Sequence, residues 1–420
     1  MRVLHTADWH LGQRFHDQLR DEDESHALEQ ILCLSRERGV DAVLVSGDVF
    51  DHPNPGARQQ RLYYETLAKL VTEAGVATVV VTAGNHDSAL RLEGPSDLLG
   101  DLGIYVVGRW PREAASSRPV LPLRDRRGEI RAACVAVPYL RDADLRLPAI
   151  GEAASEVHQR YARALEGRYE RAAKEARARY PGLPLVVMGH CYVASALLGG
   201  GERPVQIGNL AQVDARALAA EGAYLALGHL HRPQTIQEKD HWRYSGSLLP
   251  TGFDEIGQRR QVILFDIPER DGEVAGRITA VDLEPFRSYR RLEGTPAEVR
   301  EASQNLPLAD AAKPTPWCEA TLELSGPEPG LARELIDVAR DRGWNLVSVK
   351  RRPRAEGEEA STPGSRTAPA PDLRELEPEQ VFERCHVAEF GEPPDDELRL
   401  EFRSLLEEVT AGVDETAAEP

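Results

Sequence analysis

The chain has 420 residues, of which 41% are apolar and 29% charged, and its 69 acidic and 51 basic residues give a formal net charge of −18. This length predicts two or three domains, and the negative charge excludes a basic coat for wrapping nucleic acid, so any such contact must come from a local patch. No apolar run is long enough to cross a membrane, the N-terminus does not read as a secretory signal, and the five scattered cysteines form no C-x-x-C pair, which together favour a cytoplasmic protein without membrane contact or a disulfide framework.

Five apolar runs, each followed by polar residues, occur in the first part of the chain: 3–7, 41–46, 78–82, 185–188 and 224–227. Their length and composition are typical of strands that are buried on both faces of a sheet. Apolar residues at helical spacing precede the second and third runs, and residues 153–180 predict one long helix. Strands that alternate with helices indicate an α/β domain, which we expect to span residues 1–270.

The rest of the chain divides into shorter pieces. A smaller α+β unit is predicted for residues 277–352, with a strand, a helix and a strand in turn. Residues 355–371 predict a flexible linker, because they have too few large apolar side chains to offset the entropy of ordering. Residues 372–410 carry two short apolar faces at helical spacing, and residues 411–420 predict a disordered acidic tail.

Residues of the types that commonly bind metals follow all five predicted strands. The motifs are Asp-x-His, Gly-Asp, Gly-Asn-His-Asp, Gly-His and Gly-His-x-His, and they supply the candidate ligands Asp8, His10, Asp48, Asn85, His190, His229 and His231. Because the carboxyl ends of strands in open α/β sheets meet at one crevice, we expect these residues to converge. One such motif alone is typical of a turn or a helix cap, but five in succession indicate a site. The glycines before four of the ligands predict a close approach of the backbone.

The donor set of carboxylate, amide oxygen and imidazole, without thiolate, suits Mn²⁺, Fe²⁺ or Zn²⁺ and argues against structural zinc. Seven ligands are too many for one ion that keeps open positions, so we expect two ions roughly 3.5–4 Å apart that share a carboxylate, for which Asp48 is the best candidate. Such a pair lowers the pKa of bound water from about 16 towards about 7 and neutralises charge on a phosphate. His86 is the candidate catalytic residue, as a proton donor to the leaving oxygen or a support of the transition state.

Other polar residues near these motifs are given lesser roles. Asp51 and Asp87 are predicted to orient site loops or imidazoles rather than to bind metal. His16 and His52 lie in loops that leave the site strands, where contact with substrate is the less favoured interpretation. No G-x-x-x-x-G-K-[ST] motif occurs in the sequence, so any ATP dependence must come from a partner.

The motif series resembles that of the calcineurin-like metallophosphoesterases. Within that superfamily the chain resembles the SbcD family, the nuclease subunits of bacterial SbcCD complexes, in the stretches Asp-Trp-His-Leu-Gly at 8–12, Gly-Asp-Val-Phe-Asp at 47–51, Gly-Asn-His-Asp-Ser at 84–88, Leu-Gly-His-Leu-His-Arg-Pro-Gln at 227–234 and Tyr-Ser-Gly-Ser at 244–247. The first three stretches are shared with many phosphatases, and the last two are more specific. The resemblance implies a sandwich of two sheets flanked by helices, a small capping domain and C-terminal helices that bind a partner.

The resemblance also implies a division of the ligands and an activity. One Mn²⁺ would be held by Asp8, His10, Asp48 and His231, and a second by Asp48, Asn85, His190 and His229, with His86 as the catalytic histidine. The implied activity is Mn²⁺-dependent DNA cleavage in repair, recombination and replication, as a 3′–5′ exonuclease on double strands and an endonuclease on single strands and hairpins.

The implied partners are the ATPase SbcC, which would bind residues 372–410, and a second copy of the chain, as a homodimer through the nuclease domain. The alternative is another dinuclear metallophosphoesterase that acts on phosphoproteins or nucleotides, since the metal site alone does not separate these activities.

Overall fold

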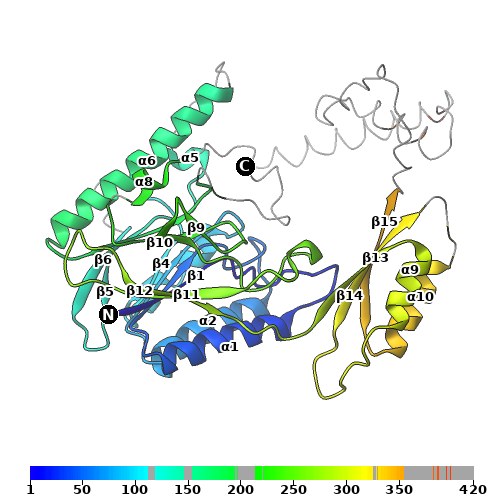
Figure 1. Cartoon of the computed structure of the whole chain (residues 1–420). Helices are drawn as coiled ribbons and strands as arrows, with labels where there is room; N and C mark the ends of the chain where they lie inside the picture. Colours follow the sequence, from blue (N-terminus) through cyan, green and yellow to red (C-terminus); the bar gives the residue numbers. More distant parts are fainter. Residues whose placement is uncertain are drawn as a thin grey trace. The chain divides into compact units, whose positions relative to one another are not determined.

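The computed structural model of the chain describes residues 1–111, 119–145, 154–193, 213–219, 221–324 and 330–353, with the isolated positions 196, 328, 382, 386, 394 and 398 (Figure 1). Residues Met1–Arg354 form one unit and Ala355–Pro420 a second. Nearly all of the second unit, including the expected linker 355–371, helices 372–410 and tail 411–420, lies outside the described residues. No helix among the described residues is long and apolar enough to cross a membrane.

Most of the strands that end at candidate ligands form the first sheet. Its strands lie in the order β12-β11-β1-β2-β3-β4, with β1 to β4 parallel and β11 and β12 antiparallel to their neighbours. Their bounds are β1 (Arg2–Thr6), β2 (Ala42–Ser46), β3 (Thr78–Thr82), β4 (Ile104–Val107), β11 (Gln261–Asp266) and β12 (Gly276–Asp282). The first three confirm strands that the apolar runs predict.

The second sheet carries the remaining ligands. Its strands lie in the order β5-β6-β7-β8-β10-β9, and β6, β7, β8 and β10 are parallel. Their bounds are β5 (Val120–Arg124), β6 (Ile130–Ala136), β7 (Leu185–His190), β8 (Tyr224–Gly228), β9 (Gln234–Ile236) and β10 (Lys239–Tyr244).

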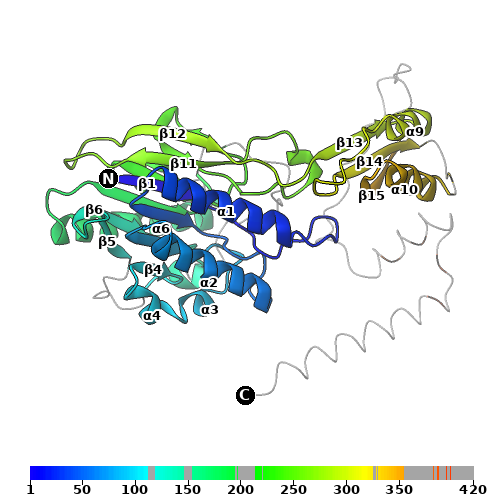
Figure 2. The same ribbon diagram turned by 90° about the horizontal axis from the view of Figure 1, so that it is seen from below.

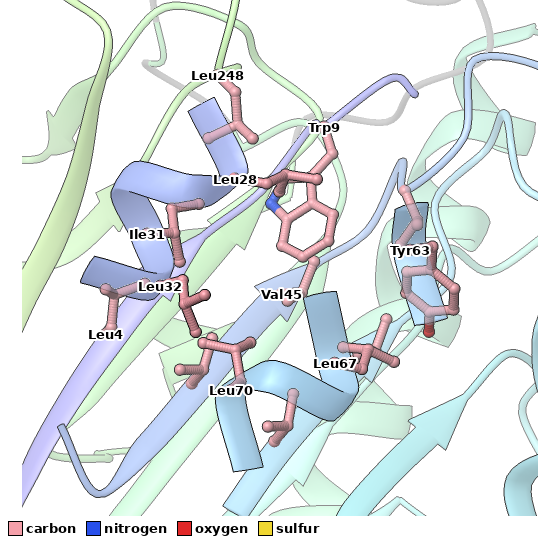
Figure 3. Close-up of a cluster of buried hydrophobic side chains, with 14 of the residues drawn as sticks. Leu4, Trp9, Leu28, Ile31, Leu32, Val45, Tyr63, Leu67, Leu70 and Leu248 are labelled. Atoms are coloured by element: carbon pink, nitrogen blue, oxygen red, sulfur yellow. The ribbon is translucent and has the colours of Figure 1, made fainter. Parts of the chain in front are cut away.

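The two sheets pack face to face, with helices on their outer faces (Figures 1 and 2). Strand β2 shows why such a strand is apolar on both faces: Leu44 belongs to the core between the sheets, whereas Val43 and Val45 pack under the helices. Figure 3 shows this outer core, where Leu28, Ile31, Leu67 and Leu70 lie over the first sheet. The helices involved are α1 (Asp21–Glu37) and α2 (Ala57–Thr72) on the first sheet and α6 (Ala154–Arg179) and α8 (Ala215–Ala219) on the second. The expected sandwich of two sheets flanked by helices is confirmed.

One buried histidine lies between the sheets. His5 on β1 is fully buried, and its Nδ1 lies 3.2 Å from the hydroxyl of Tyr224 on β8. The Tyr224 ring stacks on Phe265 of β11 at a centroid distance of 3.8 Å. Burial lowers the pKa of His5 from 6.5 to about 3, because a charged imidazole would lose its hydration between the sheets.

The buried state of His5 predicts a pH dependence of stability. The unfolded chain takes up a proton on this residue near pH 6.5 and the folded chain only near pH 3, so the free energy of unfolding contributed by His5 is retained above pH 6.5 and lost as the pH falls below it. We expect a loss of about 1.4 kcal/mol for each pH unit below 6.5. The test is the free energy of unfolding, measured by urea denaturation at several pH values between 7 and 5. This free energy should fall less steeply with decreasing pH in His5→Phe than in the wild type, and equal pH dependence in the two proteins would contradict this assignment.

A small sheet follows strand β12 of the first sheet along the chain. It consists of β13 (Tyr289–Gly294), β14 (Trp317–Leu324) and β15 (Asn345–Pro353), all parallel, with α9 (Pro296–Gln304) and α10 (Leu331–Asp341) between them. Both helices pack on one face through a core that includes Leu292, Val299 and Leu335. A capping box between Thr295 and Glu298 starts α9.

The small sheet differs from the sequence prediction in two respects. Its strands and helices alternate, so it is an α/β unit rather than the expected α+β unit, since β13 and α9 have too few apolar residues to be recognised. Strand β12 lies within the range expected for the small unit, 277–352, but pairs with β11 in the first sheet. The first sheet therefore extends beyond residue 270, and we place the proposed domain boundary between Leu283 and Tyr289.

Candidate metal centre

The candidate ligands come from both large sheets. Asp8, Asp48 and Asn85 follow β1, β2 and β3 of the first sheet, whereas His190 ends β7 and His229 follows β8 of the second. The prediction of one open sheet therefore describes only part of the geometry, because the site forms where the carboxyl ends of two facing sheets meet. All the candidate ligands except Asn85 are buried.

One group of donors gathers around His190. The Nε2 of His190 lies 3.0 Å from Asn85 Oδ1 and 3.2 Å from Asp48 Oδ2. The same Asn85 oxygen lies 2.9 Å from Nδ1 of His229. Four side chains thus direct an oxygen or a nitrogen to one small volume. We call Asn85, His190 and His229, with Asp48, the His190 group.

A second group gathers around His10. Its Nε2 lies 3.2 Å from Nε2 of His231 and 3.7 Å from Asp48 Oδ2. We call His10 and His231, with Asp48, the His10 group. Asp48 belongs to both groups, and ligand atoms of His10, Asp48 and His86, and likewise of Asp48, His190 and His229, lie within 4.8 Å of one another.

Asp8 lies beneath the two groups. Its carboxylate accepts hydrogen bonds from the backbone N–H of His229 at 2.9 and 3.1 Å, and one oxygen lies 3.9 Å from Nδ1 of His190. The structure therefore brings all seven candidate ligands together.

The outer nitrogens of three histidines face hydrogen-bond acceptors. Nδ1 of His190 lies 2.9 Å from the Ser46 carbonyl, and Nδ1 of His10 lies 3.3 Å from Asp51 Oδ1. Nδ1 of His231 lies 3.3 Å from Thr251 Oγ1 and 3.5 Å from Glu255 Oε1. With the proton held on Nδ1, each Nε2 presents a lone pair to the pocket, which is the arrangement of metal-binding histidines. Two lone pairs 3.2 Å apart, on His10 and His231, would repel each other, and a cation held between these nitrogens would remove that repulsion. The residues thus fit a dinuclear metal site.

The backbone at the site is held in an uncommon conformation. Asp8, His10 and Asp48 have φ angles of 51°, 46° and 48°, and His229 has 102°. Residues with a side chain rarely adopt positive φ, and each such residue costs of order 1–3 kcal/mol, which the surrounding structure must offset. Four of the seven candidate ligands share this feature, which is typical of sites where the direction of a side chain matters more than local stability.

Glycine is required at two of these strand ends. A methyl group on Gly47 would overlap the imidazole of His190, and one on Gly84 would overlap the carboxylate of Asp48. Gly47 also has a φ of 83°. The close approach of the backbone that the glycines predict is confirmed at both positions.

The charges of the site are those of a pocket for cations. Burial raises the pKa of Asp8 to about 7, with Asp48 adding to the rise and His190 opposing it. Burial alone would raise the pKa of Asp48 also, but His190 and His10 hold it well below its ordinary value. Burial opposes the charged form of His190, yet Asp48 and Asp8 raise its pKa to about 9. The charged forms of His190 and Asp48 thus stabilise each other.

The supporting residues are partly those that the sequence indicates. Asp87 accepts hydrogen bonds from the backbone N–H groups of Val49, Phe50 and Gly84 at 3.1, 2.9 and 2.8 Å, so it joins two site loops as predicted. Asp51 contacts His10, also as predicted.

Some supporting residues were missed. Thr251 and Glu255 hold His231, and the carbonyl of Ser46 holds His190. No sequence signal reveals them, because Thr251 and Glu255 belong to no motif and a backbone carbonyl carries no residue identity.

The remaining candidate histidines have different environments. Nδ1 of His86 lies 2.9 Å from the backbone carbonyl of Asp51, its backbone N–H donates to Asp48 Oδ1 at 2.9 Å, and its ring lies 4.9 Å from that of His10. His52 contacts Asp51 at 3.1 Å and its side chain is 73% exposed. His16 lies 3.6 Å from Glu319 of the small sheet.

The fold and the site define a class of protein. Residues 1–233, more than half of the chain, match the family model for calcineurin-like phosphoesterases. The chain belongs to this family. Residues 285–390 match a second model, that of the Type 5 capsule protein repressor C-terminal domain (SbcD_C). This match begins after β12, in agreement with the boundary placed between Leu283 and Tyr289.

Comparison with individual proteins shows a more specific resemblance within this family. The chain is 40% identical over 272 residues to SbcD, the D component of the nuclease SbcCD, of Rhodobacter capsulatus, an alignment that covers 64% of this chain and 66% of that protein. It is 34% identical to the SbcD proteins of Bacillus subtilis (63% of this chain, 66% of the relative) and Escherichia coli K12 (63% and 64%). The resemblance to SbcD that the motifs indicate is confirmed, and the chain spans just under two thirds of the length of these relatives.

Proposed function

We propose that this protein is a Mn²⁺-dependent DNA nuclease that cleaves phosphodiester bonds at two metal ions, as a component of an SbcCD-type complex. The observation that carries the proposal is the place of Asp48 in both ligand groups, because a shared carboxylate is what a pair of closely spaced ions requires. The name of the relatives, a nuclease, supports DNA as the substrate. The proposed activities are 3′–5′ exonuclease on double strands and endonuclease on single strands and hairpins, in repair, recombination and replication.

Each part of the site has a role in this reaction. The bound ions would supply a water that is acidic at neutral pH and positive charge beside the phosphate. Asp8, His10, Asp48 and His231 would hold one ion, and Asp48, Asn85, His190 and His229 the other. Nδ1 of His86 faces the backbone carbonyl of Asp51. Nε2 is therefore the nitrogen that would transfer a proton to the leaving oxygen.

The choice of substrate is tested with purified full-length protein. Linear double-stranded DNA and a small phosphomonoester are supplied in parallel, with Mn²⁺, and with SbcC and ATP present or absent. DNA cleavage that exceeds monoester hydrolysis supports the nuclease. Efficient monoester hydrolysis with intact DNA, even with SbcC and ATP, would favour a phosphatase that acts on phosphoproteins or nucleotides.

The partner SbcC is proposed to bind the C-terminal segment, residues 372–410. The SbcD_C match supports this, since it runs past the end of the first unit to residue 390. A chain that ends after Arg354 should retain the metal site, because all seven ligands and their supporting residues lie before it, but should lose SbcC. The measurement is capture of purified SbcC by each immobilised chain, and equal capture by both lengths would contradict the assignment.

A homodimer through the nuclease domain is part of the proposal. Leu90 and Leu98, on α3 (Ala89–Glu93) and α4 (Ser96–Gly100), are 65% and 77% exposed, and Leu102 beyond them is 51% exposed. These exposed leucines lie on, or just after, two successive helices, and a second copy of the chain that packs on this segment would remove them from water.

A further inference from the structure

An aromatic cluster joins the small sheet to the metal-bearing part of the chain. The ring of Phe15 lies 4.9 Å from that of Phe253, 5.6 Å from that of Tyr289 and 5.8 Å from that of Trp317, on which it stacks. Phe15, Phe253 and Trp317 are at most 4% exposed and form a separate buried cluster. Tyr289 and Trp317 are the first residues of β13 and β14, whereas Phe15 lies in a loop and Phe253 in a short helix of the metal-bearing part. We call these four residues the aromatic joint.

The two phenylalanines lie in the segments that place the His10 group. Phe15 is in the loop that follows His10. Phe253 begins the short helix η1 (Phe253–Glu255), which ends in Glu255, and both Glu255 and nearby Thr251 contact Nδ1 of His231. A shift of Phe15 or Phe253 would therefore be transmitted to His10 and His231.

A buried ion pair holds the joint in place. Arg287, in the connection between β12 and β13, donates to Asp23 of α1 from Nε at 2.8 Å and from Nη2 at 2.7 Å, and both residues are buried. The guanidinium carbon of Arg287 lies 4.2 Å from the ring centroid of Trp317. The hydroxyl of Tyr289 donates to the same carboxylate at 3.2 Å. A bidentate ion pair that packs against an aromatic ring fixes the orientation of the guanidinium group as well as its distance from the ring.

Among the described residues, the three ligands that belong to the His190 group alone, Asn85, His190 and His229, show no such link to the small sheet. The described contacts of Asn85, His190 and His229 lead to Asp8, Ser46, Asp48 and Tyr139, all of which belong to the two large sheets and their loops. Within the described part of the chain, the small sheet therefore bears on one of the two ligand groups and not on the other.

We propose that the small sheet positions the His10 group for its metal ion, and that Trp317 is the positioning residue through which it acts. The proposal rests on the dinuclear site of the proposed function. Loss of the Trp317 ring removes the surface on which Phe15 stacks and opens the cluster that Phe15 shares with Phe253, so His10 and His231 lose their fixed separation. Because supporting residues beyond the ligands typically contribute about 10–100-fold to metal affinity, Trp317→Leu should weaken one Mn²⁺ site by that factor and leave the other unchanged.

The test is a calorimetric Mn²⁺ titration of the full-length protein, with electron paramagnetic resonance of the same samples. Wild type should bind two ions and show the signal of a coupled pair, whereas Trp317→Leu should keep one tight site and show mainly isolated Mn²⁺ at the same concentration. Trp317→Phe keeps a ring in the joint and should restore most of the second site. Thermal melts identify any variant that has not folded.

Trp344→Leu is the matched control. Trp344 is a tryptophan of the same small unit, 5% exposed, but it packs in the core beneath the helices and not in the aromatic joint. It should bind both ions as the wild type does. Three results would overturn this proposal while leaving the proposed function intact. They are equal weakening of both sites by Trp317→Leu, no weakening by Trp317→Leu, and the same loss in Trp344→Leu. Fewer than two ions on the wild type would instead overturn the proposed dinuclear function, and this inference with it.

Discussion

Asp48→Ala is expected to abolish Mn²⁺-stimulated DNA cleavage, with a loss of at least about 10³-fold, because one substitution removes a ligand from both metal positions. The buried carboxylate also accepts the backbone N–H of His86 and contacts His190. Its loss therefore leaves His190 with one acidic neighbour fewer and removes the hydrogen-bond acceptor that holds the backbone of His86, the proposed catalytic histidine. The measurements are the cleavage rate and the number of Mn²⁺ ions bound per chain.

Asp48→Asn is the matched variant for this prediction. It keeps the size of the side chain and an oxygen that can accept the His86 N–H, but it removes the negative charge that two cations share. We expect it to fold as the wild type does and still to lose most of the activity and the metal. Cleavage and two bound ions in Asp48→Ala would show that Asp48 does not bridge the ions.

His86→Ala is expected to lower the rate of DNA cleavage by about 10²–10⁴-fold, the usual contribution of a general acid, while two Mn²⁺ ions remain bound. The reason is its position: His86 is held beside the His10 group by Asp51, but the seven other side chains complete the ligand set. The geometry also brings a ring nitrogen of His86 within reach of a metal held by His10 and Asp48, so metal content distinguishes the two roles.

His52→Ala is the control for His86. His52 lies in a nearby loop and contacts the Asp51 side chain, but it is mostly exposed. It should retain nearly full activity and both ions. Loss of one ion in His86→Ala would make this histidine a ligand, and unchanged cleavage would remove it from the reaction.

The convergence of the candidate ligands could be predicted from sequence because it depends on local rules. A strand that is buried on both faces is an uninterrupted apolar run, so the ends of β1, β2, β3, β7 and β8 are visible as the points where polar residues begin. The glycines before Asp48 and Asn85 could be interpreted for a similar reason, since a methyl group at either position would overlap a site residue. Asp87 is the last residue of the Gly-Asn-His-Asp motif, and its link between two loops could be predicted from that position.

Other features depend on contacts between distant parts of the chain. The apolar runs and motifs alone indicate one open sheet, because no local sequence pattern shows that β7 and β8 face β1 to β3 across a common core. Only the family resemblance implies two sheets. The range expected for the small unit, 277–352, takes in strand β12, whose pairing with β11 in the first sheet is a property of the folded chain. The support of His231 by Glu255 and the contact of Phe15 with Trp317 join residues far apart in sequence, and neither is part of a recognisable pattern.

The central claim is that two cations share Asp48 in the pocket between the large sheets. Anomalous scattering at the manganese edge, from crystals of the full-length protein grown with Mn²⁺, tests it most directly. We predict two peaks roughly 3.5–4 Å apart, one beside His10 and His231 and the other beside Asn85, His190 and His229. A pocket without peaks, or with a single peak that does not contact Asp48, would contradict the account.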